Sequence, residues 1–148
     1  MVTTRIGFFA TALAALGCGS DGGDRYVGTG TATVIPRDTG LEQQTRTNGD
    51  EEVRALRTSD GGIVLSFDGC ELTTGPLRDG QASLPRGASC EGRTARGSAR
   101  FTVTRGNVAL WPGGDRLSLM LEGEGESTAS GNRELVRYLY SFSGRRRE

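Results

Sequence analysis

The chain contains no histidine and no lysine, and only 6% of its residues are aromatic. Histidine is the commonest general base and metal ligand, and it is the usual partner of a serine or cysteine nucleophile. A serine and a carboxylate without either base form a poor nucleophilic set, and no other catalytic constellation is recognisable. We therefore expect a protein that is not an enzyme and that carries neither a metal nor a cofactor.

An excess of charge of either sign is also lacking. The 18 basic residues, all arginine, balance 18 acidic residues, so the formal net charge is +0. Domains that bind nucleic acid carry a basic patch or stripe, and this balanced chain predicts no basic face. Nucleic acid is therefore not an expected partner.

Glycine, in contrast, is abundant. The chain has 24 glycines but only 4 prolines, and 34% of its 148 residues are hydrophobic. Because the glycines follow no period of three, a collagen-like structure is excluded. This composition is typical of a turn-rich β protein with a modest core, and the length suits one domain.

Period-two alternation of apolar and polar residues dominates after residue 25. Such alternation predicts half-buried β-strands. Asn48-Gly49 is a strong hairpin signal, although residues 50–57 would also fit a short helix. Residues 91–97 read as a loop or an irregular edge. The expected strands are 26–35, 51–58, 63–67, 70–74, 81–84, 98–105, 108–111, 116–126 and 134–143, and the polar segment 41–47 is a weak candidate.

About eight or nine short strands without a convincing helix predict an all-β domain. Tight turns between consecutive strands favour a small antiparallel meander that closes, or nearly closes, into a lipocalin-like β-barrel. A β-sandwich is the alternative. Glycines expected to point inward, at 28, 30, 123 and 125, would allow the curvature that a small barrel needs.

Aromatic residues are placed where they could fill or line the barrel. Tyr138, Tyr140 and Phe142 share one face of the last expected strand. They therefore fill the core or, if the barrel has a cavity, line a ligand site. Trp111 precedes Pro112 at a turn, where it serves either in recognition or as a cap on the core.

Residues 1–18 have the parts of a secretory signal peptide. An apolar run from Ile6 to Leu16 follows a short segment with one positive charge. The run is too short to cross a bilayer, which takes about 20 residues. Its end, ALGC at 15–18, resembles the lipobox of bacterial lipoproteins, most of which have leucine where this chain has Ala15.

The resemblance implies that residues 1–17 are removed and that Cys18 is acylated with palmitate-type chains, which anchor the protein in the cell envelope. Some lipoproteins are retained in the inner membrane by an aspartate after this cysteine. Here Gly19 follows, so the outer membrane is expected in a Gram-negative host. Two alternatives stay open, namely plain secretion after cleavage at Ala14 and an uncleaved apolar N-terminus.

The parity of the cysteines supports acylation. If Cys18 carries lipid, Cys70 and Cys90 remain as an even pair, and a disulfide is the expected state in an exported chain. A redox pair would normally have C-x-x-C spacing, which these cysteines lack. Residues 18–24 are then the acylated cysteine and a tether, whose six residues 19–24 have an r.m.s. span of about 13 Å, and a single β domain follows at 25–148.

Two charged groups invite a functional interpretation. Glu122, Glu124 and Glu126 share one strand face and could bind Ca²⁺ if neighbours added oxygen ligands. We favour a solvated face in which Arg137 and Arg133 are the partners. The arginines at 145–147 either contact anionic lipid or glycan phosphate or form a frayed, solvated tail.

The sequence names no ligand. We expect a non-catalytic binding module at the membrane surface, for a protein, a glycan or a small apolar ligand. A structural envelope lipoprotein and an inhibitor of an envelope enzyme are the alternatives. An interior cavity lined by Tyr138, Tyr140 and Phe142 would favour a ligand carrier. A filled core with an exposed aromatic loop around Trp111 would favour recognition of a protein or glycan.

Overall fold

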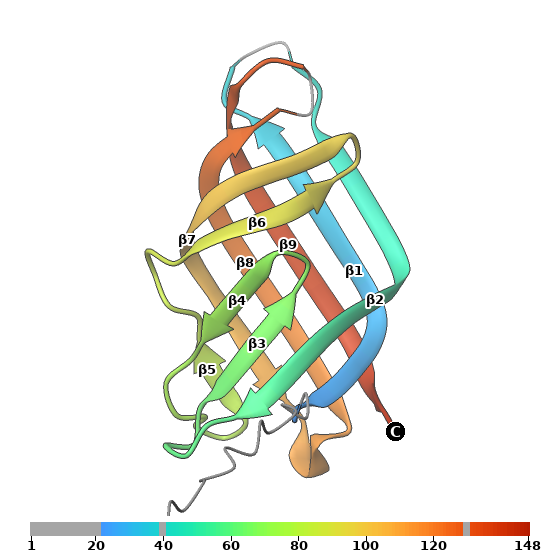
Figure 1. Cartoon of the computed structure of the whole chain (residues 1–148), viewed down its shortest axis with the longest axis vertical. Helices are drawn as coiled ribbons and strands as arrows, with labels where there is room; N and C mark the ends of the chain where they lie inside the picture. Colours follow the sequence, from blue (N-terminus) through green and yellow to red (C-terminus); the bar gives the residue numbers. More distant parts are fainter. Residues whose placement is uncertain (1–21, 39–40, 129–130) are drawn as a thin grey trace, which may run out of the picture.

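The structure is a computed structural model that describes residues 22–38, 41–128 and 131–148. Cys18 and the expected signal peptide lie outside these residues. The described chain is all-β, with nine antiparallel strands and one short 3-10 turn, as the sequence predicted (Figure 1). None of the described segments forms a helix long and apolar enough to cross a membrane.

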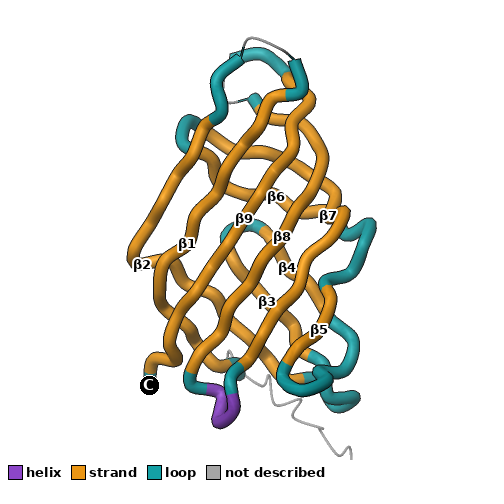
Figure 2. The backbone as a smooth tube through the Cα atoms, turned by 180° about the vertical axis from the view of Figure 1, so that it is seen from behind, coloured by secondary structure: helices purple, strands orange, loops and turns teal. Residues whose placement is uncertain are grey.

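The strands form one sheet with the order β4-β3-β2-β1-β9-β8-β7-β5, and β6 also pairs with β7. The first and last strands, β1 and β9, therefore lie side by side in the middle of the sheet, which Figure 2 shows from behind. The strands are β1 (Asp24–Pro36), β2 (Gln44–Arg57), β3 (Ile63–Phe67), β4 (Cys70–Thr73), β5 (Gln81–Ser83), β6 (Ser89–Thr94), β7 (Gly97–Leu110), β8 (Arg116–Ser127) and β9 (Glu134–Arg147), with the 3-10 turn η1 (Pro112–Gly114) between β7 and β8.

The sheet curls until its two edges meet, which makes a nearly closed barrel (Figure 1). The β3–β4 hairpin forms one edge and β6 forms part of the other. They are joined by a single bridge between Gly69 and Glu91 and by the Cys70–Cys90 disulfide. The structure thus confirms the predicted disulfide, and it shows that the bond crosses the seam of the barrel.

The core follows the predicted alternation. On β9, Val136, Tyr138, Tyr140 and Phe142 are buried while the residues between them are more exposed. On β8 the leucines at 117, 119 and 121 are buried in the same way. Both strands therefore place an apolar face inside the barrel, where burial of apolar surface stabilises the fold by about 25 cal/mol per Å².

The predicted hairpin at Asn48-Gly49 is wrong. β2 runs without interruption through both residues, and this also excludes a helix over 50–57. The register with β1 shifts here, because Gly30 faces Asn48 while Gly28 faces Glu51. The Asn48 side chain accepts a hydrogen bond from the Asp50 backbone at 3.1 Å. The same local chemistry that favours a turn thus makes a β-bulge, which bends the strand.

Three other boundaries differ from the prediction. Residues 98–111 were expected as two strands, but β7 is continuous through Gly106-Asn107 because β8 pairs with it on both sides of that position. Residues 91–97 were expected as a loop, but most of them belong to edge strand β6. β9 continues to Arg147 instead of ending at Ser143. In each case pairing with a long neighbour overrides a weak local preference.

Removal of the disulfide should test the seam. The bond closes a loop with a sequence separation of 20, so the Cys70→Ala/Cys90→Ala double variant should lose about 3 kcal/mol of unfolding free energy. Urea denaturation of oxidised wild type and of the variant measures this difference. Equal midpoints would show that the bond does not constrain the sheet edges.

Candidate functional site

The aromatic residues predicted for the last strand fill the barrel interior. The Tyr138 ring stacks on Phe101, with ring centroids 4.3 Å apart. The Tyr140 ring stacks on Phe67 at 5.0 Å. Tyr138, Tyr140 and Phe142 are each at least 97% buried. The tyrosine rings therefore pack against rings of other strands, as core residues do. This packing gives no support to a ligand-lining role for the three side chains.

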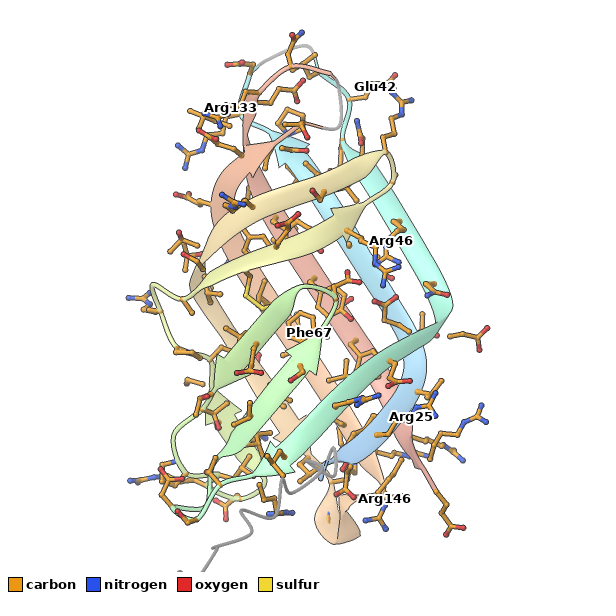
Figure 3. The ribbon with its side chains drawn as sticks, viewed as in Figure 1. Arg25, Glu42, Arg46, Phe67, Arg133 and Arg146 are labelled. Atoms are coloured by element: carbon orange, nitrogen blue, oxygen red, sulfur yellow. A yellow bond between two sulfur atoms is a disulfide. The ribbon has the colours of Figure 1, made fainter. Side chains whose placement is uncertain are left out.

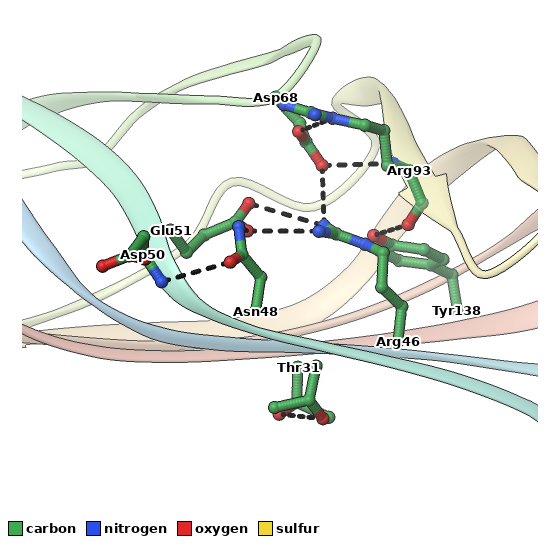
Figure 4. Close-up of polar contacts among 9 residues, drawn as sticks. Thr31, Arg46, Asn48, Asp50, Glu51, Asp68, Arg93 and Tyr138 are labelled. Atoms are coloured by element: carbon green, nitrogen blue, oxygen red, sulfur yellow. Dashed lines mark hydrogen bonds and ion pairs between the residues drawn. The ribbon is translucent and has the colours of Figure 1, made fainter.

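A cluster of charged side chains lies beside these rings (Figure 4). Arg46 of β2 contacts Glu51 at 3.2 Å and Asp68, in the β3–β4 turn, at 3.4 Å. Arg93 of β6 pairs with the other oxygen of Asp68, and its backbone N–H donates to Asp68 at 3.1 Å. Asn48 donates to Glu51 at 3.0 Å. The cluster therefore ties β2 to both edges of the seam.

Burial makes this cluster different from a surface ion pair. Glu51 is only 4% exposed, and the Asp68 side chain is 3% exposed. Two buried carboxylates need compensating partners, because an uncompensated buried charge costs several kcal/mol. Arg46 supplies one guanidinium to both, so the group holds the seam in one geometry, and we interpret it as structural.

The same environment acts on the tyrosine hydroxyls. Burial raises the pKa of Tyr138 and of Tyr140 far above the ordinary value, and the nearby carboxylates of Asp68 and Glu51 raise both further. The Tyr138 hydroxyl donates to the Arg93 carbonyl at 3.3 Å. The Tyr140 hydroxyl is buried and has no hydrogen-bond partner among the described residues. Both side chains therefore remain neutral phenols in the folded protein.

Sequence reasoning missed this cluster. The one sequence signal for the cluster is the alternation of Gln44, Arg46 and Asn48. These polar residues occupy inward positions of β2. Because the partners Asp68 and Arg93 come from distant parts of the chain, no local pattern could show that these positions face inward.

A matched pair of substitutions should separate the buried cluster from surface charge. Glu51→Gln leaves Arg46 under-compensated in the interior, so the free energy of unfolding should fall by about 3 kcal/mol. Glu52→Gln, at the neighbouring and partly exposed position that pairs with Arg25 and Arg54, should cost about 1 kcal/mol or less. Thermal and urea unfolding measure both. Equal losses would contradict the structural role of the cluster.

The glutamate row on β8 lies on the outer face, where each carboxylate has an arginine partner. Glu122 contacts Arg105 and Arg137, and both arginines lower its pKa, Arg137 the more strongly. Glu124 pairs with Arg37 at 2.7 Å, and Glu126 with Arg133 at 3.2 Å. The predicted partners Arg137 and Arg133 are thus confirmed. No group of three metal-ligating side chains occurs in the described part of the chain.

The outer face of β1, β9, β8 and β7 is hollowed into an open groove of about 770 Å³. Its wall includes the Glu122 ion pairs, and Met120, which is 61% exposed, lies in it beside Leu139. The Thr31 hydroxyl at its border shares a hydrogen bond with Thr47 (Figure 4). The groove thus combines an apolar strip with hydroxyl, guanidinium and carboxylate groups. The sequence did not predict it, because it depends on the curvature of four strands.

Trp111 lies outside the core. It is 44% exposed and borders a smaller groove of about 330 Å³ at the end of the barrel, together with Leu77, Leu110 and Pro112. The arginines at 145–147 are not a frayed tail, because they continue β9 and pair with β1 and β8. An aromatic side chain is thus exposed at the turn where the sequence placed it.

The chain matches no protein-family model, and it has no match among curated proteins or solved structures.

Proposed function

We propose that the chain is a lipid-anchored protein of the cell envelope whose β domain is a non-catalytic binding module at the membrane surface. The lipobox-like end of the apolar run at 6–18 supports the anchor. The parity of the cysteines supports it further, because Cys70 and Cys90 pair with each other and leave Cys18 as the remaining thiol. In a Gram-negative host the proposed location is the outer membrane.

The outer groove carries the proposal of binding. Small-molecule and peptide sites are concave, with an apolar surface and a few convergent polar groups. The groove of about 770 Å³ has this character through Met120, Leu139 and the Glu122 ion pairs. The stacked rings inside the barrel support an external site over an internal carrier. The proposed partner is an envelope protein or a glycan.

Site-specific crosslinking in the native host tests both parts of this proposal. A photoreactive residue at Met120 should give a discrete adduct with a protein or glycan, because that side chain lies in the groove. The matched control is Leu135, an equally exposed apolar residue of β9 at 57%, which does not border the groove. Adduct at both positions, or at neither, would contradict a binding site in the groove.

The Cys18→Ser variant of the same protein tests the anchor. The wild type should fractionate with membranes, and the variant should lose its acyl mass and leave the membrane fraction. A variant that remains fully membrane-bound would contradict the proposed anchor, whatever the crosslinking shows.

A further inference from the structure

The tether end of the barrel is the end at which β1 begins and β9 finishes. It carries Trp111 and, as Figure 3 shows, Arg25 and Arg146, while Arg133 and Glu42 lie at the opposite end. Gly23 lies against β2 here, because a Cβ built on it would be 3.2 Å from the Ala55 carbonyl oxygen. The five residue-to-residue steps from Cys18 to Gly23 can span about 18 Å at most. Cys18 is therefore within about 18 Å of this end in any conformation.

Arginines gather on the outer face of this end. Arg116 of β8 lies directly opposite Arg145 of β9, and Arg25 of β1 lies opposite Arg147 of β9. All four are exposed. Residues opposite each other in paired strands point to the same face, as do residues two apart on one strand, so the four arginines share the outward face of three adjacent strands. Like charges directly opposite each other in a sheet are destabilising. Repulsion between the opposed arginines therefore destabilises the sheet unless an anion binds between them and offsets it.

Few carboxylates compensate these arginines. Glu52 pairs with Arg25, and Asp24 is 3.7 Å from Arg146. Within the described ranges, no carboxylate lies at ion-pair distance from Arg116, Arg145 or Arg147, although Asp115 and Glu148 are close to them in the sequence. Three guanidinium groups at the tether end thus remain available to an external anion.

Trp111 adds an apolar element to the same end. Its backbone N–H donates to the Arg116 carbonyl at 3.0 Å, so the tryptophan and Arg116 flank the same turn. η1 is held at the barrel end by the Tyr26 hydroxyl, which donates to the Gly114 carbonyl at 2.9 Å. Tryptophan is enriched at membrane–water interfaces, where its amphipathic ring lies at the level of the headgroups.

We propose that the tether end docks on anionic lipid headgroups, with Arg116, Arg145 and Arg147 contacting the phosphates and Trp111 entering the interface. This inference rests on the proposed acyl anchor, which would hold the end within reach of the bilayer. Each arginine near an anionic surface strengthens the membrane contact roughly fivefold. Two contacts, the acyl chains and the docked end, would then fix the orientation of the outer groove relative to the membrane. A flexible tether alone would not fix it.

Fluorescence of the acylated protein in vesicles tests the docking. Trp111 is the only tryptophan of the chain, so quenching by lipids that carry a quencher near the headgroup reports on this end alone. Vesicles of phosphatidylcholine with phosphatidylglycerol should give strong quenching, and phosphatidylcholine alone should give little. High salt should abolish the difference, because screening weakens contacts between exposed charges.

Two matched triple variants identify the residues responsible. Arg116→Gln/Arg145→Gln/Arg147→Gln should reduce the docking equilibrium on anionic vesicles roughly 100-fold, from three contacts of about 1 kcal/mol each. The control, Arg96→Gln/Arg100→Gln/Arg133→Gln, removes the same charge at exposed positions away from the tether end and should dock as the wild type does. Circular dichroism verifies that both variants are folded.

The outcomes separate this inference from the proposed anchor. A protein whose Cys18 carries no acyl group by mass spectrometry would contradict the anchor itself. An acylated, vesicle-bound protein whose Trp111 is unquenched on every lipid composition would overturn the docking and leave the end free for a protein or glycan. Equal quenching with and without phosphatidylglycerol, or equal loss in the two variants, would also overturn it.

Discussion

The seam between the β3–β4 hairpin and β6 is the constraint on which this barrel depends. Backbone pairing across this seam consists of one bridge, between Gly69 and Glu91. The sheet therefore does not close by continuous pairing there. The disulfide and the Asp68 contacts with Arg46 and Arg93 supply what the backbone pairing lacks. Unpaired strand edges invite association with other chains, so the covalent and ionic closure also protects these edges.

Closure determines where function can reside. With the edges joined, the tyrosine and phenylalanine rings of β9, β3 and β7 stack in the interior, and the charged cluster occupies the space beside them. The described core side chains thus pack against one another inside the barrel. The two proposed contact sites lie on the outer surface, where the groove lies on one side and the arginines with Trp111 lie at the tether end.

Much of the fold could be predicted from the sequence, because period-two alternation and cysteine parity are read from the chain directly. The inward positions of Tyr138, Tyr140 and Phe142 follow from that alternation. The bulge at Asn48 could not be predicted, since the same turn chemistry serves a hairpin and a bulge. The charged cluster and the outer groove depend on partners far apart in the chain and on sheet curvature, which no local pattern contains.

Tyrosine ionisation tests the filled interior most directly. Burial raises the pKa of Tyr26, Tyr138 and Tyr140, which are all the tyrosines of the chain. The folded state thus keeps protons that an unfolded chain loses near pH 10, and stability falls as pH rises above that value. In an ultraviolet titration, Tyr138 and Tyr140 should remain neutral near pH 10 and should form tyrosinate only as the protein unfolds at higher pH. Reversible ionisation of Tyr138 and Tyr140 near pH 10 in the folded protein would contradict a filled barrel and indicate a wet, open interior.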